Sequence, residues 1–313
     1  MRQYPTFDGV TLLWSLRQMY GLASALVLIH TCKTTIDLKP PGGVLLDDDS
    51  KLEVEKGEEQ YGRHGNIKPE NILWFKQALD IEEVDNMGVL QITDFGLGRF
   101  HGRESRSNVD PETVNATPTY EPPECKLEKP VSRAYDIWSM ACLYLEFVTW
   151  LLEGTQAIHD FGNARGERRE SFLMIDDKRH TIINDDNFFT ILRDKNNLRS
   201  AVIREAVVQW VERLHMHSNC SKMLHELLDL VMDDLLRPYS SQRINSTSLK
   251  KKMRTILDKA ESNPGYLLKP SPRPTLPPSP SSAAGQRSLS RKGVRFAETW
   301  PTKNSPPSPR SPK

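Results

Sequence analysis

The residues of this chain most able to do chemistry lie in one segment, His64-Gly65-Asn66-Ile67-Lys68-Pro69-Glu70-Asn71. The segment holds an imidazole, two amides, an ammonium group and a carboxylate. An amide such as that of Asn66 orients a hydroxyl by hydrogen bonding, but it cannot accept the hydroxyl proton as a carboxylate can. Asp94 follows a short apolar run, residues 89–92, that is typical of a strand. Taken alone, Asp94 could be a turn residue and Asn71 a loop cap, so both are interpreted together with their neighbours.

Four further motifs follow the segment along the chain. They are Ile92-Thr93-Asp94-Phe95-Gly96, Pro122-Pro123-Glu124, Asp136-Ile137-Trp138-Ser139 and Arg243. Together the five resemble, in order, landmarks of eukaryotic Ser/Thr protein kinases: the catalytic loop, the D-F-G motif, the A-P-E motif, the D-x-W-S helix and the arginine that pairs with the A-P-E glutamate. Five landmarks in one order make chance a poor explanation. The resemblance covers residues 8–260 and only the C-terminal lobe of the kinase fold.

The resemblance implies ATP-dependent phosphoryl transfer to protein substrates. In the family, the positions of Asn71 and Asp94 hold magnesium ions, and the position of Lys68 contacts the transferred phosphate. Lys68 also favours the Ser/Thr branch over the tyrosine-specific one. The positions that would support this site are His64, Phe95, Gly96, Glu124, Asp136 and Arg243.

The catalytic-loop segment departs from the family pattern at two positions. Asn66 stands at the position of the catalytic aspartate, so the general base, typically worth about 10²–10⁴ in rate, is lost. Gly65 replaces an arginine that often contacts a phosphorylated activation loop, which leaves Thr117 and Thr119 without a local partner for their phosphorylated forms. We therefore expect phosphoryl transfer to be weak or absent. The alternative function is a catalytically inactive interaction module, a pseudokinase.

The small lobe of the kinase fold has no counterpart among the residues before His64. A glycine-rich loop and a VAIK-type lysine do not occur there, so a five-stranded lobe does not fit and binding of Mg-ATP is in doubt. Two interpretations stay open: a degenerate remnant, or a Met1 that is a false start within a longer reading frame.

Composition points to a soluble domain joined to a polar segment. Mean hydropathy is −0.54 and the net charge of +1 gives no case for nucleic acid or an anionic membrane as the main partner. Four widely spaced cysteines favour reduced thiols in an intracellular, cytoplasmic or nuclear protein. The most apolar predicted helix, residues 136–152, carries Asp136 and Glu146 and is short for a membrane span, so we expect a buried central helix instead.

The hydrophobic pattern predicts a mainly α fold, the C-terminal lobe of a protein kinase with short β-hairpins at the catalytic and D-F-G loops and without the N-terminal β-lobe. Helices are predicted over residues 10–31 and 136–152 and at three later stripes: Val202 to Leu214, Leu224 to Leu235, and Leu249 to Leu257 with a cap at Asn245 or Ser246. Residues 72–75 and 89–92 should pair as a hairpin. The activation segment spans residues 94–124.

Two insertions and a tail interrupt this domain, which spans residues 1–262. Residues 33–60 contain an acidic run, for which a solvated loop is favoured over a docking patch, and residues 153–185 are charged and weakly patterned. Residues 263–313 hold over half of the 22 prolines and are predicted to be disordered, with Ser-Pro pairs open to phosphorylation.

Two smaller motifs allow sharper hypotheses. Lys292-Gly293-Val294-Arg295-Phe296 resembles the peptide that docks on protein phosphatase type 1 through Val294 and Phe296, although an ordinary basic stretch is the favoured interpretation. His215, His217, Cys220 and His225 are candidate zinc ligands, but their spacing matches no familiar zinc motif, which favours ordinary loop histidines.

Overall fold

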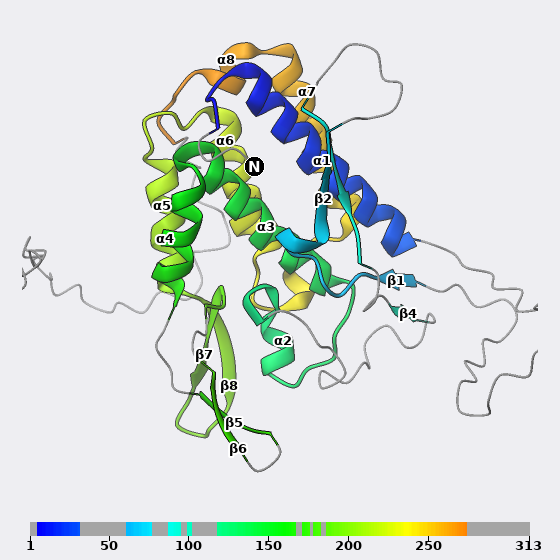
Figure 1. Cartoon of the computed structure of the whole chain (residues 1–313), viewed down its shortest axis with the longest axis vertical. Coiled ribbons are helices and arrows are strands. Elements are labelled where there is room, and N and C mark those ends of the chain that lie inside the picture. The colour runs from blue at the N-terminus through cyan, green and yellow to red at the C-terminus, as the bar shows by residue number, and fades with distance from the viewer. Residues whose placement is uncertain are drawn as a thin grey trace, which may run out of the picture. The chain divides into compact units, whose positions relative to one another are not determined.

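One long apolar helix forms the centre of the fold in the computed structural model, which describes residues 5–31, 61–76, 87–94, 99–101, 118–166, 171–175, 178–182 and 186–273 (Figure 1). This helix, α3 (Ala134–Glu153), is buried from Tyr135 to Leu152, because its residues are apolar on almost every side. It ends where Gly154 takes a φ of 83°, a left-handed conformation that favours glycine. The predicted central helix is thus present and two residues longer at its start.

Helix α1 (Gly9–Thr31) lies along α7 (Ser246–Ser262), far from it in sequence (Figure 1). Of the helices that the structure describes, α1 is the one long and apolar enough to cross a membrane, although the sequence pattern marks α3 as the most apolar helix. A buried core helix passes the same test. The side chains of Leu12, Leu16 and Leu26 are 0–1% exposed in the shared core with α3 and α7.

The predicted hairpin of residues 72–75 and 89–92 is present as strands β2 (Ile72–Phe75) and β3 (Val89–Ile92), paired antiparallel. Gly88 closes it with a φ of 84°, and a Cβ there would lie 2.2 Å from the carbonyl oxygen of Phe75. A second pair joins β1 (Tyr61–Arg63) to β4 (Arg99–His101), on either side of the catalytic loop and the D-F-G motif. Every sheet among the described ranges has two strands.

The region after α3 differs from the prediction in two places. The predicted unpatterned insertion contains helix α4 (Thr155–Arg165) and the paired strands β5 (Ser171–Ile175) and β6 (Lys178–Ile182). Val202 and Ile203, assigned to a helix by periodicity, lie in β8 (Arg199–Ile203), which pairs with β7 (Phe189–Arg193). Helix α5 (Glu205–His215) begins after Arg204, whose backbone is extended.

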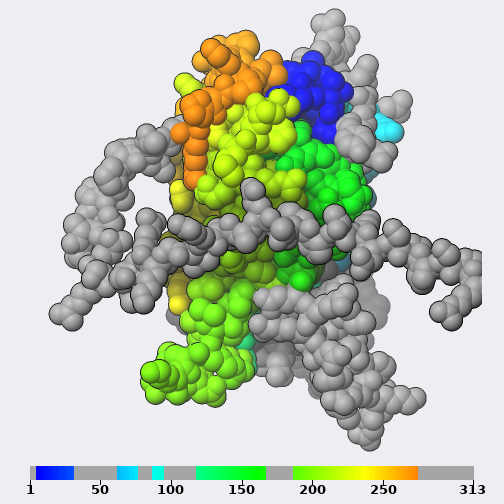
Figure 2. Space-filling view, turned by 90° about the vertical axis from the view of Figure 1, so that its left-hand side faces the viewer, coloured from blue at the N-terminus to red at the C-terminus, as the bar shows by residue number. Residues whose placement is uncertain are grey.

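The last helices follow the predicted stripes more closely. Helix α6 (Lys222–Leu230) continues as a π-helical turn, η6 (Val231–Leu235), and the Asn245 side chain caps α7 by accepting a hydrogen bond from Ser248 N. A short helix, α8 (Pro264–Leu268), then packs on α6 and α7. Figure 2 shows the orange residues of this part of the chain beside the blue N-terminal residues. One compact unit runs from Met1 to Pro274, whereas the sequence pattern places the domain boundary at residue 262. The remaining tail and the acidic insertion lie outside the described residues.

Within the described ranges, four short elements connect these parts. They are η2 (Pro69–Asn71), η5 (Pro118–Tyr120), α2 (Pro123–Lys126) and η7 (Ser240–Gln242).

Candidate functional site

The catalytic-loop segment, residues 64–71, leaves β1 and ends in η2, and its own polar groups hold it in shape. The Asn66 backbone N–H donates to His64 Nδ1 at 3.3 Å. The Asn66 carbonyl oxygen accepts from Asn71 Nδ2 at 2.8 Å. Asn71 is buried and Asn66 is partly buried. Because the Asn71 Nδ2 is directed at Asn66, its amide oxygen faces the other way and is left as an acceptor.

The segment is also tied to the residue that precedes Asp94. Thr93 N donates to the Asn71 carbonyl oxygen at 2.9 Å, and His64 Nε2 lies 2.9 Å from the Thr93 carbonyl oxygen. Since His64 Nδ1 accepts from Asn66, the ring proton sits on Nε2 and is donated to Thr93. Asp94 itself is exposed and has a φ of 63°, which few non-glycine residues adopt. The two candidate magnesium ligands, Asn71 and Asp94, therefore lie on two backbone segments that hydrogen bonds join through Thr93.

Of the other positions that the resemblance implies, some are described by the structure and some are not. Lys68 is partly buried at the start of η2, in extended backbone with a φ of −161°. Phe95, Gly96 and Thr117 lie outside the described residues. Thr119 is described, and its hydroxyl donates to the Asp186 carboxylate at 2.6 Å.

Asp136, in the first turn of α3, anchors the start of the loop. One carboxylate oxygen accepts from His64 N at 2.9 Å, the other accepts from Gly65 N at 2.8 Å, and His30 Nε2 lies 2.8 Å from the first. Burial raises the pKa of Asp136, but the hydrogen bonds from His30, Gly65 and His64 outweigh it and hold the pKa below 3.8. Asp136 is therefore an ionised, fully buried acceptor for two backbone N–H groups.

Replacing Asp136 with asparagine should destabilise the lobe, because an amide offers one acceptor where two N–H groups need one each. The cost of a buried donor left unpaired is about 1–3 kcal/mol. Urea unfolding at pH 7 measures it. A depressed folded-state pKa contributes stability that is complete above pH 3.8 and is lost as pH falls through the folded value, so the gap between the two proteins should narrow below pH 3.8. A gap that is unchanged at low pH would contradict this role for the carboxylate.

Gly65 has a φ of 76°, so its conformation favours glycine over other residues. Gly65→Ala should cost about 1–2 kcal/mol of unfolding free energy, the strain of a left-handed L-residue. Gly21→Ala is the matched control, because Gly21 lies inside α1 with nothing within 4 Å of an added Cβ. That change should stabilise the protein by about 0.5–1 kcal/mol. Equal effects of the two substitutions in thermal unfolding would argue against strain at Gly65.

The ion pair that the resemblance implied between Glu124 and Arg243 is present. The Arg243 Nη1 and Nη2 atoms each lie 2.7 Å from a different Glu124 carboxylate oxygen. Arg243 also donates to the carbonyl oxygens of Ala134, Arg237 and Pro238, which engages all five of its N–H groups. The pair joins α2 to the segment before α7.

A second buried ion pair was not predicted. Glu146 of α3 accepts from Arg165 Nη2 at 3.2 Å and from the Tyr120 hydroxyl at 2.9 Å. Burial raises the pKa of Glu146 more than Arg165 and Tyr120 lower it. The available signal was the charge of Glu146 within an apolar helix, but its partners lie too far along the chain to be found from the pattern.

Of the four candidate zinc ligands, three meet in space: His215, Cys220 and His225. His217 does not belong to the group. Burial lowers the pKa of His215 to about 4 and raises that of Cys220 to about 12, so both are neutral near pH 7.

Comparison with known proteins finds serine/threonine-protein kinases among the relatives of this chain. The chain is 31% identical over 103 residues to the serine/threonine-protein kinase H1 homolog of Danio rerio, covering 33% of this chain and 21% of that protein. It is 34% identical over 80 residues to the human serine/threonine-protein kinase H2, covering 26% and 18%, and 37% identical over 87 residues to cyclin-dependent kinase 2 of Caenorhabditis elegans, covering 28% and 20%. The chain thus spans about a fifth of the length of these curated relatives. The family model of the protein kinase domain matches residues 60–253, more than half of the chain, and the chain therefore belongs to the protein kinase family.

Proposed function

We propose that this chain is a serine/threonine-type kinase lobe that keeps the magnesium-holding half of the catalytic apparatus and has lost the proton-accepting half. The observation that carries the proposal is a pair of hydrogen bonds made by Asn71. Its Nδ2 donates to the Asn66 carbonyl oxygen, and its own carbonyl oxygen accepts from Thr93 N. The first bond holds the loop in shape, and the second joins the loop to Thr93, which directly precedes Asp94. The names of the relatives support the serine/threonine type.

The residues present offer ligands that suit magnesium. Mg²⁺ prefers oxygen ligands, and the free amide oxygen of Asn71 and the exposed carboxylate of Asp94 provide them. Magnesium bound there would neutralise charge on the phosphates of ATP. Lys68, three residues before Asn71, would contact the transferred phosphate.

Asn66 changes what the loop does with the acceptor hydroxyl. Its amide can orient a serine or threonine hydroxyl, but it cannot remove the proton. The expected loss is about 10²–10⁴ in rate relative to a loop with a carboxylate. Slow phosphoryl transfer, rather than the turnover typical of kinases, is the activity that this loop supports.

Binding of Mg-ATP tests the proposal without requiring turnover. We expect Mg-ATP to raise the midpoint of thermal unfolding, by the equivalent of about 2.7 kcal/mol at a hundred times the dissociation constant. Asp94→Asn should abolish the shift, and EDTA should do the same. Asp160→Asn is the matched control, because Asp160 is an exposed acid of α4 away from the loop. No shift for the unmodified chain, or equal shifts for both variants, would refute the proposal.

The second candidate function is an interaction module that binds partners without catalysis. It is favoured by the two departures at Gly65 and Asn66 and by the basic segment 292–296. In this case a peptide of residues 288–300 should bind protein phosphatase type 1 by adding a strand that places Val294 and Phe296 in pockets. Calorimetry with the peptide and with a Val294→Ala, Phe296→Ala peptide is the test. Equal affinity of the two peptides would remove the docking hypothesis.

A further inference from the structure

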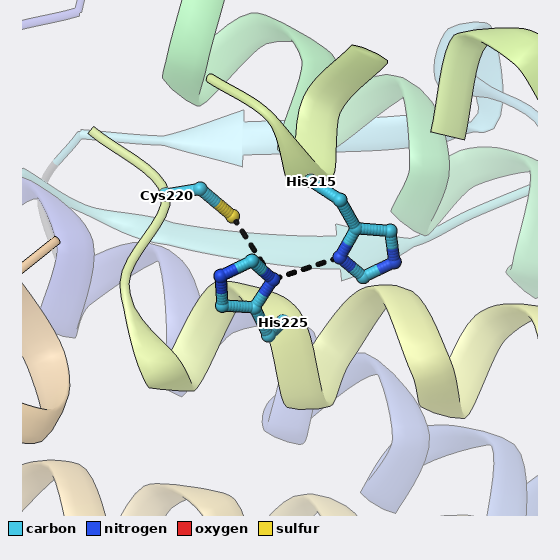
Figure 3. A group of neighbouring side chains, drawn as sticks. All are labelled: His215, Cys220 and His225. Atoms are coloured by element: carbon cyan, nitrogen blue, oxygen red, sulfur yellow. Dashed lines mark hydrogen bonds between the residues drawn. The ribbon is translucent and has the colours of Figure 1, made fainter. Parts of the chain in front are cut away.

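Three buried side chains with metal-binding chemistry converge at the junction of α5 and α6 (Figure 3). His215 is the last residue of α5, Cys220 lies just before the N-cap of α6, and His225 is in α6. They are 5%, 1% and 1% exposed, and one ligand atom of each lies within 4.8 Å of the others. The kinase chemistry proposed above uses none of them.

The positions of the protons on the two imidazoles favour a cation between them. His225 Nε2 lies 2.8 Å from the Ser271 carbonyl oxygen, which can only accept, so Nε2 carries the hydrogen and Nδ1 has a free lone pair. This Nδ1 faces His215 Nδ1 at 2.8 Å and Cys220 Sγ at 3.6 Å. Two nitrogens and a sulfur therefore point at one space, and Figure 3 shows them turned toward one another.

One hydrogen shared between the two Nδ1 atoms leaves another ring nitrogen of His215 without a hydrogen-bond partner. If His215 Nδ1 donates its hydrogen to His225, its Nε2 is left as a bare lone pair that is buried and lies 3.6 Å from the Asp229 carboxylate. With a metal bound to both Nδ1 atoms, the His215 hydrogen moves to Nε2 and points toward Asp229. Both outer nitrogens would then be directed at oxygen atoms, as is usual for histidines that bind metals.

One of the two ligand-to-ligand distances matches zinc, and the other is close to it. With Zn–N near 2.0–2.1 Å and Zn–S near 2.3 Å, tetrahedral geometry separates sulfur and nitrogen by about 3.6 Å and two nitrogens by about 3.3 Å. The Cys220–His225 separation of 3.6 Å meets the first value, and the two rings need to part by about 0.5 Å to meet the second. A mixed nitrogen and sulfur set selects zinc over the magnesium expected at the catalytic loop.

We propose that His215 Nδ1, Cys220 Sγ and His225 Nδ1 form a zinc site, with water or another ligand in the fourth position. Zinc would bind the Cys220 thiolate, and the thiol proton would be released to water. The site joins α5 and α6 to the segment that follows α8. Ser271 N donates to the Cys220 carbonyl oxygen at 3.0 Å, and Arg273 bridges Glu212 and Asp229 with two bonds of 2.8 Å. Zinc would therefore stabilise the packing of the segment after α8 against α5 and α6. Residues 275–313 follow this segment in the sequence.

Metal content of the untagged full chain tests the proposal. The unmodified chain, stripped with a chelator and reloaded with zinc sulfate, should retain one zinc ion per chain after gel filtration. Cys220→Ser and His225→Ala should lose it, whereas His217→Ala, two residues from the site, should keep it. Asp229→Asn should weaken zinc binding by about 10–100-fold, the usual effect of removing an outer partner. Circular dichroism of each metal-free variant reports whether it is folded.

Cobalt provides a readout that needs no variant. Co²⁺ bound by a thiolate gives a sulfur-to-cobalt charge-transfer band in the near ultraviolet, so the unmodified chain should develop this band with one equivalent of Co²⁺ and lose it when zinc is added. Failure of the unmodified chain to retain zinc, absence of the cobalt band, or full retention by folded Cys220→Ser would each overturn the site.

Discussion

Arg243→Met should lower the free energy of unfolding by about 3–5 kcal/mol, the usual cost of removing one partner from a buried ion pair. The arginine and Glu124 side chains are 0% and 4% exposed, so water cannot replace the lost partner. The substitution leaves the Glu124 carboxylate buried and unpaired, and it also removes the donors to three backbone carbonyl oxygens. Methionine fills the side chain only as far as the position of Nε, so the loss combines the charge and the hydrogen bonds with a small cavity at the place of the guanidinium group.

Urea denaturation followed by circular dichroism measures this loss, and a double-mutant cycle separates its causes. Glu124→Gln alone should also destabilise the lobe, but the double variant should lose less than the sum of the two, because neither charge is then left alone. Arg254→Ala is the control, since the Arg254–Asp258 pair of α7 is half exposed and should matter far less. Additive losses in the cycle would show that the two residues act separately.

Local patterns and the family resemblance predicted the parts of the site for which they supply the pairing partner, and they missed the pairings for which they supply none. The hairpin of β2 and β3 follows from local pattern, as does a helix cap at Asn245 or Ser246, of which the structure has Asn245. The Glu124–Arg243 pair, 119 residues apart, follows from the resemblance to the kinase family. Val202 and Ile203 were assigned to a helix because their apolar spacing continues that of α5. Their pairing with β7 decides the strand, and periodicity over a short apolar run does not contain that information.

Clusters of side chains are also difficult to predict from the sequence, because their members meet only when the chain is folded. His215, Cys220 and His225 are separated by equal steps of five residues, which matches no short zinc motif, and including His217 hides even that regularity. Only the turn between α5 and α6, together with the carbonyl oxygen of Ser271, brings the ligand atoms to one point. Likewise, Glu146 contacts Arg165 because α4 packs against α3. The sequence of α3 alone does not predict this packing.

Asn66→Asp should raise phosphoryl transfer from Mg-ATP to a serine peptide by about 10²–10⁴, the usual worth of a general base. The exchange is nearly isosteric. The backbone of residue 66 is already held by His64 Nδ1 and Asn71 Nδ2, so the new carboxylate would occupy the place of the present amide. The amide of Asn66 can orient the acceptor hydroxyl. A carboxylate in its place could also accept the proton of that hydroxyl.

Transfer of labelled phosphate to a mixed serine and threonine peptide library, with the thermal shift by Mg-ATP recorded in parallel, makes this prediction decisive. Asn66→Asp combined with Asp94→Asn should lose the gain, because the metal-holding carboxylate would be absent. Asn66→Ser is the control for altered size without a base, and it should not gain activity. If Asn66→Asp binds Mg-ATP as the unmodified chain does and transfers no faster, the missing base is not what limits the chain, and the interaction role gains support. A rise in transfer of the expected size would instead show that the loop geometry held by Asn71 and Thr93 is competent for catalysis and lacks only its carboxylate.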